Sequence, residues 1–461
     1  MKKLTISLVQ FALIFILSLS LAFPAFAEEE TETAETSSEE TSDEETTDED
    51  EQTASSDEWP EEPDLISGSA LVIDTVTGAV LYSKNDTEVI YPASTTKILT
   101  CLLALENCSL DETVTFSETA VDIPSDASNI SAVAGEEMTL EDCLYGLMLP
   151  SGNECANAIA EHVAGSIEAF VEMMNEKAEE LGCTNTHFAN PNGLYDSDHY
   201  STAQDMSLIA QACFSNSEFV EIVSHSSYTI AATNMSEKRE ITNSNKLIQS
   251  SSEYYNSTVV GGKTGYTAIG GRALVFLSES DNMNLICVFF NSSDYYGVFE
   301  DAVDMLDYVY NNFSIVNISE AEERFSASFE NAKVVLDTTA SIIIPNSISL
   351  SSLDSEIIFA TDMDAEEFAQ AKLDAGITTQ DGRHLYAAIN YYYDGNYLGN
   401  IYVLIDDTLE FAQASVSNII YLDPGYGIAA AALALVIMFL VIKAGSARRK
   451  KLTKTKFYGK K

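Results

Sequence analysis

The sequence is short of positive charge, of tryptophan and of proline. Its 461 residues include 23 Lys and Arg against 72 Asp and Glu, with one Trp and nine Pro, and the formal net charge is −49. This excess of negative charge argues against nucleic acid or an anionic membrane surface as the main partner of the folded part. The hydrophobic content of 46% is ordinary, so the chain can form large cores and is long enough for two or three domains.

Common metal-binding and redox patterns are also missing. No C-x-x-C or H-E-x-x-H spacing occurs, and the five histidines are scattered along the chain. The seven cysteines stand mostly among apolar residues, as Cys287 does, and an odd number cannot all pair. We therefore interpret them as buried small side chains rather than a disulfide framework. The sequence predicts no metal site and no cofactor.

Both ends of the chain predict export and anchoring. Residues 1–27 have a charged start, an apolar stretch and the Ala25-Phe26-Ala27 site of a signal peptide, with an uncleaved anchor as the alternative. Residues 425–443 form an apolar run near the length of a membrane-spanning helix, with a buried core helix as the alternative. Nine basic residues and no acidic one follow from Lys443 on. The positive-inside rule places the tail 444–461 in the cytoplasm and the preceding chain outside a single-pass cell membrane anchor.

Composition and periodicity divide the remaining chain into three parts. Residues 28–64 are rich in Asp, Glu, Ser and Thr without a basic residue, which predicts a disordered acidic tail. Residues 65–315 have the pattern of strands, then helices, then strands and a closing helix, which predicts one antiparallel sheet with helices on its faces. Residues 318–417 contain short strands and a hairpin pattern around Asp394-Gly395, which predicts a small β-rich, all-β domain acting as a spacer.

A serine and a lysine three residues apart lie in the first part of the 65–315 region. Ser94 and Lys97 follow Pro92, a typical helix start, and precede residues with helical apolar spacing. Side chains three apart share a helix face, so the hydroxyl and the amine can meet near free backbone N–H groups. An amine that takes the hydroxyl proton and N–H groups that hold an oxyanion are what a serine nucleophile needs. Alone, this spacing is common by chance.

Two further motifs occur in a fixed order after this pair. Ser151-Gly152-Asn153 follows a predicted helix, and Lys263-Thr264-Gly265 lies on a predicted strand. The order S-x-x-K, S-D-N, K-T-G marks β-lactamases and penicillin-binding proteins, and the middle motif here is Ser-Gly-Asn. All three motifs in order, behind a signal peptide, are a strong signal for acyl transfer at Ser94. No G-x-S-x-G occurs, so the nucleophile elbow of another hydrolase class is absent.

The sequence resembles the low-molecular-mass D-alanyl-D-alanine carboxypeptidases, the serine penicillin-binding proteins of peptidase family S11. The resemblance spans about 65–315 and implies an α+β fold of the β-lactamase/transpeptidase type. It also implies removal of the terminal D-alanine from peptidoglycan pentapeptide stems and acylation by β-lactam antibiotics. It is carried by the stretches 92–97, 147–153, 188–194, 201–206 and 262–267.

The resemblance assigns roles to the matching positions. Ser94 attacks the carbonyl between the two D-alanines, Lys97 is its base, and Ser151 together with Lys263 passes a proton to the leaving amine. Arg272 is expected either at the substrate carboxylate or as an ordinary surface residue. The substrate-binding residues are Asn153 at the peptide carbonyl, Lys263 and Thr264 at the substrate carboxylate, and Gly265 and Tyr266 at the strand edge, where the N–H groups of Ser94 and Tyr266 form the oxyanion hole.

Several alternatives remain open from the sequence. A β-lactamase needs a deacylating carboxylate, and no clear E-x-x-L-N lies between the second and third motifs. Endopeptidase activity on cross-links is not separated by the motifs, and a catalytically inactive wall-binding scaffold conflicts with three intact motifs. The loop Asn190-Pro191-Asn192-Gly193 is expected to be structural, and His187 and His199 are expected to be ordinary loop or surface residues.

Overall fold

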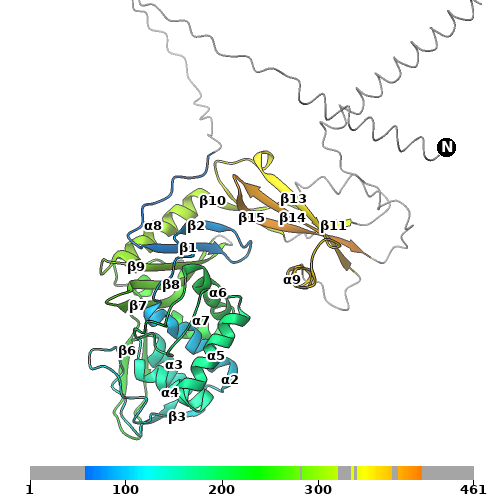
Figure 1. The fold of residues 1–461 in the computed structure, drawn as a ribbon. Helices are drawn as coiled ribbons and strands as arrows, with labels where there is room; N and C mark the ends of the chain where they lie inside the picture. Colours follow the sequence, from blue (N-terminus) through cyan, green and yellow to red (C-terminus); the bar gives the residue numbers. More distant parts are fainter. Residues whose placement is uncertain (1–57, 281–282, 320–333, 337–339, 376–382, 407–461) are drawn as a thin grey trace, which may run out of the picture. The chain divides into compact units, whose positions relative to one another are not determined.

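The structure is a computed structural model that describes residues 58–280, 283–319, 334–336, 340–375 and 383–406 (Figure 1). The predicted signal peptide at 1–27, membrane helix at 425–443 and basic tail at 444–461 lie outside these residues. Within the described ranges, no helix is both long enough and apolar enough to cross a membrane.

A five-stranded antiparallel sheet forms the centre of the 65–315 region (Figure 1). Its strands lie in the order β2-β1-β9-β8-β7, so the first strands of the region pair with the last ones. The prediction of one antiparallel sheet built from the terminal strands is confirmed, and β7 lies at its edge. The strands are β1 (Ser69–Asp74), β2 (Val80–Lys84), β7 (Val259–Thr267), β8 (Gly271–Ser280) and β9 (Met283–Ser292).

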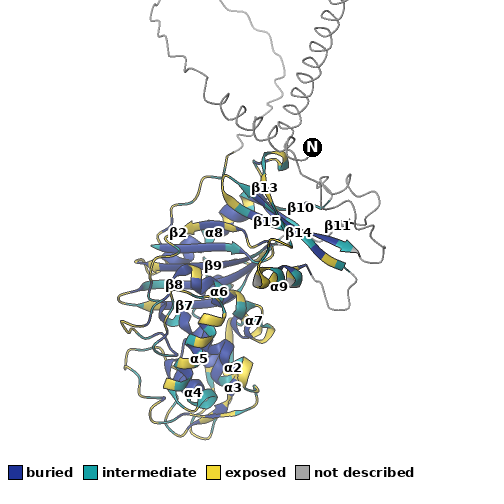
Figure 2. Cartoon of the chain, turned by 45° about the vertical axis from the view of Figure 1, so that its right-hand side comes forward, coloured by how far each residue is buried: buried dark blue, intermediate teal, exposed yellow. Residues whose placement is uncertain are grey.

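The strands direct alternate side chains into two different cores, as a strand period of two requires. In β9, Ile286 and Val288 contribute to a core shared with α2–α6, whereas Leu285 and Cys287 pack with α8 on the other face. Figure 2 shows the buried strands between these layers. The helices are α2 (Lys97–Asn107), α3 (Leu140–Met148), α4 (Asn153–Ala164), α5 (Ile167–Glu180), α6 (Ala203–Phe214), α7 (Ser217–Ser224) and α8 (Gly297–Asn312).

Short elements connect the helices and carry parts of the site. The 3₁₀ turn η1 precedes α2, and β3–β4 and β5–β6 form small antiparallel pairs. Their bounds are η1 (Ala93–Thr96), β3 (Thr113–Thr115), β4 (Glu137–Thr139), β5 (Ser227–Ile230), β6 (Arg239–Thr242) and η2 (Lys246–Ile248).

The described residues between 313 and 406 form two small sheets, one α-helix and one 3₁₀ turn. The β14–β15 hairpin turns at Asp394 and Gly395, which have φ of 48° and 82°, as a two-residue type I′ turn requires. The predicted hairpin is therefore confirmed. The sheets have the orders β10-β12 and β11-β15-β14-β13. The elements are β10 (Phe313–Asn317), β11 (Val334–Leu336), β12 (Ser341–Pro345), η3 (Leu350–Ser352), β13 (Asp354–Phe359), α9 (Ala365–Asp374), β14 (Arg383–Tyr393) and β15 (Asn396–Asp406).

The prediction of an all-β domain at 318–417 is wrong in one respect, because this stretch contains α9. Phe368 and Ala371 are three residues apart and pack on the same side, in a cluster with Leu385 and Leu404 of β14 and β15. This spacing is helical rather than alternating, so the helix buries a narrow stripe against the four-stranded sheet.

The predicted disordered tail at 28–64 also extends too far. Its last residues, 58–64, are described, and Trp59 makes an edge-to-face contact with Phe313 at 5.3 Å between ring centroids. The backbone carbonyl of Pro60 accepts a hydrogen bond from the Tyr308 hydroxyl at 3.4 Å. A large aromatic side chain supplies enough apolar area to order a short polar segment. The rest of the predicted tail lies outside the described residues.

Candidate active site

Ser94 and Lys97 lie at the junction of η1 and α2. Ser94 is on the 3₁₀ turn and Lys97 is the first residue of the α-helix, with 3.0 Å between Ser94 Oγ and Lys97 Nζ. A 3₁₀ turn has three residues per turn, so it points these two side chains the same way. Ala93, just before the serine, has a φ of 51°, a conformation that a residue with a Cβ rarely adopts. Backbone strain of this kind concentrates at functional sites.

The Lys97 amine has three close oxygen neighbours, and their chemistry differs. The Asn153 side-chain carbonyl accepts from Nζ at 2.9 Å and the Asn192 backbone carbonyl accepts at 2.5 Å. These two oxygens can only accept, whereas the third neighbour, the Ser94 hydroxyl, can also donate. A neutral amine has two N–H donors and one lone pair, so this set of neighbours suits the neutral form with Ser94 donating to it.

Burial keeps the Lys97 amine close to this neutral form. Lys97 is fully buried, which lowers its pKa well below the usual value, and the positive charge of Lys263 lowers the pKa further. Burial also lowers the pKa of Lys263 to about 7. Neither lysine forms an ion pair with a carboxylate within the described part of the chain. The predicted base therefore sits where an amine loses its proton more readily than an exposed lysine does.

The second motif lies in the turn between α3 and α4. Asn153 begins α4, and its amide donates to the Ser128 carbonyl at 2.8 Å, which orients the side-chain oxygen toward Lys97. Ser151 has a φ of 70° and a buried hydroxyl without a hydrogen-bond partner among the described residues. A buried polar group without a partner is uncommon in a native protein. This hydroxyl is therefore available to a substrate or a water.

The third motif lies on the edge strand β7, directly beside η1. A Cβ atom added at Gly265 would stand 3.2 Å from the Ser94 nitrogen, so glycine lets the strand approach the nucleophile closely. Lys263 is buried, and its Nζ donates to the Thr264 carbonyl at 2.8 Å. The structure thus brings Ser94, Lys97 and Lys263 into one site from two distant parts of the sequence.

Two residues contact the site in ways that the sequence did not predict. Asn192, expected to be structural, places its backbone carbonyl on Lys97. The Oγ atom of Ser244 lies 2.6 Å from Oγ1 of Thr264. Thr264 is the β7 residue that the third motif predicts to bind the substrate carboxylate. A backbone carbonyl carries no side-chain signal, so only a motif spanning the loop could have indicated Asn192. An isolated serine offers no signal at all.

The Asn192 loop is held against the nucleophile by close packing. Thr100 Oγ1 donates to the Pro191 carbonyl at 2.6 Å, which ties the loop to α2. Gly193 has a φ of 78°, and a Cβ there would stand 1.9 Å from the Ala93 carbonyl oxygen. Only glycine fits this position, on both conformational and steric grounds.

Tyr266 and Arg272 lie beyond the third motif. The Arg272 guanidinium stacks on the rings of Tyr266 and Tyr295, with its central carbon 4.3 Å and 4.0 Å from the two ring centroids. These three residues line an open hollow of about 530 Å³ beside the end of β7. Arg272 is therefore oriented by its neighbours rather than free on the surface.

Three more polar side chains lie near the motifs in different settings. His199 is in a loop as predicted but is buried, which lowers its pKa to about 4. Its Nδ1 accepts from the Ala189 N–H, so Nε2 carries the proton and donates to Thr96 Oγ1 at 2.8 Å. His187 is exposed to solvent. Glu154 is buried in the first turn of α4 and accepts from the Ile130 N–H at 2.7 Å.

The sequence is similar to those of known proteins. The sequence profile of the D-alanyl-D-alanine carboxypeptidase family, peptidase S11, matches residues 56–294. The D-alanyl-D-alanine carboxypeptidase DacF of Bacillus subtilis (strain 168) is 36% identical over 251 residues, covering 53% of this chain and 62% of that protein. DacB2 of Mycobacterium tuberculosis (strain H37Rv) is 34% identical over 239 residues, covering 49% of this chain and 78% of that protein.

A solved structure has the same fold. The crystal structure of the Streptomyces K15 DD-transpeptidase is 29% identical, with a TM-score of 0.51, and the match covers 55% of this chain and all of that one. This likeness confirms the predicted β-lactamase/transpeptidase-type sheet with helices. The chain spans about three fifths of the length of the Bacillus relative. With its family profile matched over more than half of its residues, the chain belongs to the D-alanyl-D-alanine carboxypeptidase family, peptidase S11.

Proposed function

We propose that this chain is a serine-type D-Ala-D-Ala carboxypeptidase that removes the terminal D-alanine from peptidoglycan pentapeptide stems. The observation that carries the proposal is the 3.0 Å contact between the Ser94 hydroxyl and the fully buried Lys97 amine. A desolvated amine without a carboxylate partner is a base, and the hydroxyl beside it becomes a nucleophile. No metal or cofactor is needed for this chemistry.

Acylation begins when Lys97 takes the proton from Ser94 Oγ. The oxygen attacks the carbonyl carbon of the penultimate D-alanine, and the carbonyl oxygen becomes negatively charged. The backbone N–H groups of Ser94 and Tyr266 hold this oxyanion. The C–N bond then breaks, the leaving amine receives a proton, and free D-alanine departs. The carbonyl of the shortened stem stays bonded to Ser94 as an ester.

The buried Ser151 hydroxyl is suited to carry the proton to the leaving amine. It has no hydrogen-bond partner among the described residues, so nothing competes with the substrate for it. Its oxygen can accept a proton from the lysines while its hydrogen passes to the amine nitrogen. Water then attacks the ester, Lys97 serves again as base, and the proton returns to Ser94.

The substrate fits as an extra strand along β7. An edge strand has a free row of backbone groups that can pair with an extended peptide. Lys263, Thr264 and Ser244 are suited to hold the terminal carboxylate. In a protein of net charge −49, these groups give the anionic end of the substrate a local partner. Asn153 is positioned to bind the peptide carbonyl while it orients Lys97.

The same site is suited to react with β-lactam antibiotics, whose strained amide occupies the place of the D-Ala-D-Ala bond. A β-lactamase is the main alternative, and rapid turnover of penicillin rather than a long-lived adduct would favour it. Transfer of the acyl group to an amine or cleavage of cross-links uses the same acyl-enzyme. An inactive wall-binding scaffold would form no adduct.

The proposed place of action is outside the cell membrane, where peptidoglycan lies. The signal peptide pattern at 1–27 and the apolar run at 425–443 with its basic tail support a single-pass anchor at the C-terminal end. Protease treatment of intact cells tests this: residues 65–315 should be accessible from outside and the tail 444–461 protected.

The reaction is tested by measuring D-alanine released from a synthetic pentapeptide stem by the full-length chain. We expect release by the wild type and none by Ser94→Ala, which removes only the nucleophilic oxygen. The matched control is Ser224→Ala, whose exposed hydroxyl bonds only its own helix. Release by Ser94→Ala at the wild-type rate would end the proposal.

A further inference from the structure

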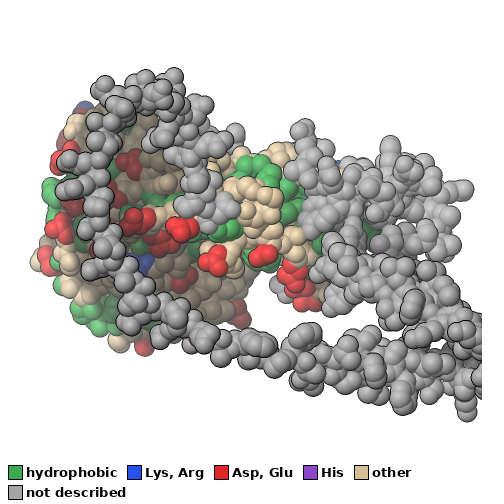
Figure 3. Space-filling model, turned by 90° about the horizontal axis from the view of Figure 1, so that it is seen from above, with side chains coloured by type: hydrophobic (Ala, Val, Ile, Leu, Met, Phe, Trp, Pro, Cys, Tyr) green, Lys and Arg blue, Asp and Glu red, His purple; other side chains and the backbone are tan. Residues whose placement is uncertain are grey.

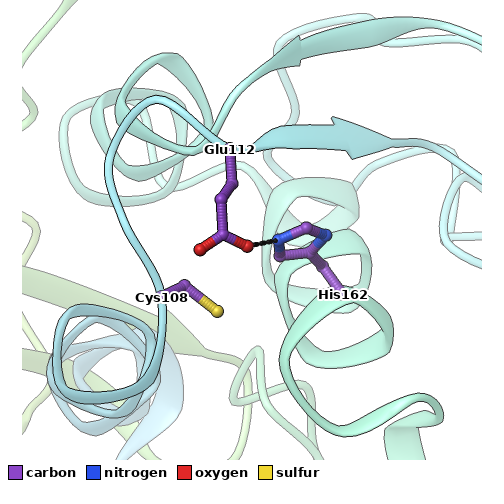
Figure 4. A group of neighbouring side chains, drawn as sticks. All are labelled: Cys108, Glu112 and His162. Carbon is purple, nitrogen blue, oxygen red and sulfur yellow. Dashed lines mark hydrogen bonds and ion pairs between the residues drawn. The ribbon is translucent and has the colours of Figure 1, made fainter.

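A group of three metal-ligating side chains lies at the far ends of α2 and α4. Cys108 follows the last residue of α2, His162 is in the last turn of α4, and Glu112 precedes β3 (Figure 4). One ligand atom from each lies within 4.8 Å of the other two. Among the described residues, no other group of three His, Cys, Asp or Glu side chains meets this distance. Sequence spacing predicts no metal site here, because the three residues are brought together only by the packing of α2 on α4.

We propose a binding site for Zn²⁺ or a chemically similar divalent metal ion, formed by the side chains of Cys108, Glu112 and His162. The donor set decides the class of ion, because a thiolate and an imidazole suit Zn²⁺, whereas Mg²⁺ and Ca²⁺ prefer oxygen ligands. Three protein ligands leave the fourth position of a tetrahedral site for water.

The distances are close to those of a bound ion. His162 Nε2 and Glu112 Oε2 lie 3.0 Å apart. Ligand bonds of about 2.0–2.3 Å place neighbouring ligand atoms of a tetrahedral Zn²⁺ about 3.5 Å apart. Cys108 Sγ lies within 4.8 Å of both atoms, so the sulfur must move closer to reach this spacing.

The carboxylate is already held in place for such an ion. Glu112 Oε1 accepts from the Ser109 N–H at 2.7 Å, which leaves Oε2 to face His162 (Figure 4). Hydrogen bonds of this kind orient the ligands of natural metal sites. The side chains of His162 and Glu112 are 20% and 43% exposed, so an ion in solution can reach them.

The electrostatics of the region also favour a cation. α2 and α4 run parallel, since their first residues meet at Lys97 and Asn153, so their C-terminal ends lie together at the cluster. The C-terminal end of a helix carries a partial negative charge. The whole chain is acidic as well, with 72 Asp and Glu against 23 Lys and Arg, and Figure 3 shows acidic side chains on one described face.

The ion would link the two helices that position the base without entering the reaction. The 11 residues of α2 span about 16 Å at 1.5 Å per residue, which separates the cluster from Ser94. We therefore expect metal binding to stabilise the fold and to leave the acylation rate at Ser94 unchanged.

The test uses the full-length chain after removal of metal by a chelator, with Co²⁺ as a spectroscopic probe and Zn²⁺ as the competing ion. We expect one Co²⁺ per chain with a thiolate-to-cobalt charge-transfer band, displaced by Zn²⁺. The band should disappear in Cys108→Ser and weaken strongly in His162→Gln. Cys183→Ser is the matched control, because Cys183 is also half-buried but lies outside the cluster, and its band should equal that of the wild type. An absent band, or an unchanged band in Cys108→Ser, would overturn the proposal.

A second measurement needs no variant. Zn²⁺ at a hundredfold excess over its dissociation constant should raise the melting temperature of the wild type by about 5 °C. It should also slow alkylation of Cys108, measured by peptide mapping, while alkylation of Cys183 continues as before. Equal alkylation of Cys108 with and without Zn²⁺ would contradict the site even if Cys108→Ser failed to fold.

Discussion

The two ends of the α2–α4 helix pair hold polar groups in different settings. At the N-terminal ends, Lys97 is fully buried, its polar neighbours are carbonyls and a hydroxyl, and its pKa is lowered. At the C-terminal ends, Cys108, Glu112 and His162 are half-exposed, and the hydrogen bonds from Ser109 and His162 lower the pKa of Glu112. The helix dipoles favour negative charge at the first end and positive charge at the second.

The difference shows how one structural unit can support both a reaction and a binding site. An amine without water or a carboxylate partner becomes a base, whereas a thiol, an imidazole and a carboxylate that are open to water remain available to an ion. Lys177 shows the contrasting case for a lysine. Burial alone would lower its pKa, but hydrogen bonds and charge from Glu106 and Glu180 outweigh burial and raise the pKa.

The largest effect on the reaction is expected from removing the buried Lys97 amine. Lys97→Met keeps the apolar stem but deletes the base, so we expect the rate of acylation by benzylpenicillin to fall about a thousandfold. The rate is measured by stopped-flow or by labelling with a fluorescent penicillin. Lys177→Met serves as the control, and a wild-type rate in Lys97→Met would show that another group is the base.

A second change disturbs the packing that places Ser94. Gly193→Ala puts a methyl group 1.9 Å from the Ala93 carbonyl, so the Asn192 loop and η1 must move apart. A displacement of Ser94 by about 1 Å can lower the acylation rate about a hundredfold. Gly165→Ala is the matched control, with a similar φ of 83° but no atom within 4 Å of the added methyl group. Equal acylation rates in the two variants would show that the clash with Ala93 does not affect the reaction.

The pH dependence tests the coupling between the two lysines. Acylation needs neutral Lys97, so its rate rises as the pH passes through the lowered pKa of this amine. Lys263→Gln removes the positive charge that helps to lower that pKa, so we expect the acidic limb to move to higher pH by about one unit. Above pH 7 the wild type should bind the substrate carboxylate more weakly, because the pKa of Lys263 is about 7. An acidic limb unmoved in Lys263→Gln, or moved equally in Lys177→Gln, would exclude this coupling.

The smallest effect is expected at Ser244. Ser244→Ala removes the hydroxyl that contacts Thr264, so we expect a several-fold rise in KM for the pentapeptide and little change in kcat. A single neutral hydrogen bond contributes about 1 kcal/mol, which limits the effect. Ser224→Ala should match the wild type. A large fall in kcat instead would place Ser244 among the groups that act in the transition state.

The sequence was sufficient to predict the sheet and the three motifs, because two motifs lie where a helix begins and the third lies within a strand that contains glycines. Ser94, Asn153 and Gly265 are at the start of η1–α2, the start of α4 and the edge of β7. Local sequence rules for helix starts and for glycines in strands apply at these positions.

The remaining features depend on contacts between distant segments. Asn192 contributes a backbone carbonyl, which any residue could supply, so its identity carries little information about the contact. Cys108 and His162 come together only because α2 and α4 run parallel, and no spacing rule describes that. The packing of Trp59 depends on Phe313, at the other end of the region. α9 was missed because a short helical stripe differs little from a polar loop.

The most direct test of the account is to locate the covalent adduct that penicillin forms with the full-length chain near neutral pH. Intact-mass spectrometry followed by peptide mapping should find one adduct per chain, on the peptide that contains Ser94, and none in Ser94→Ala. An adduct on another residue, or no adduct on a folded wild-type chain, would contradict the claim that the buried Lys97 amine activates the Ser94 hydroxyl.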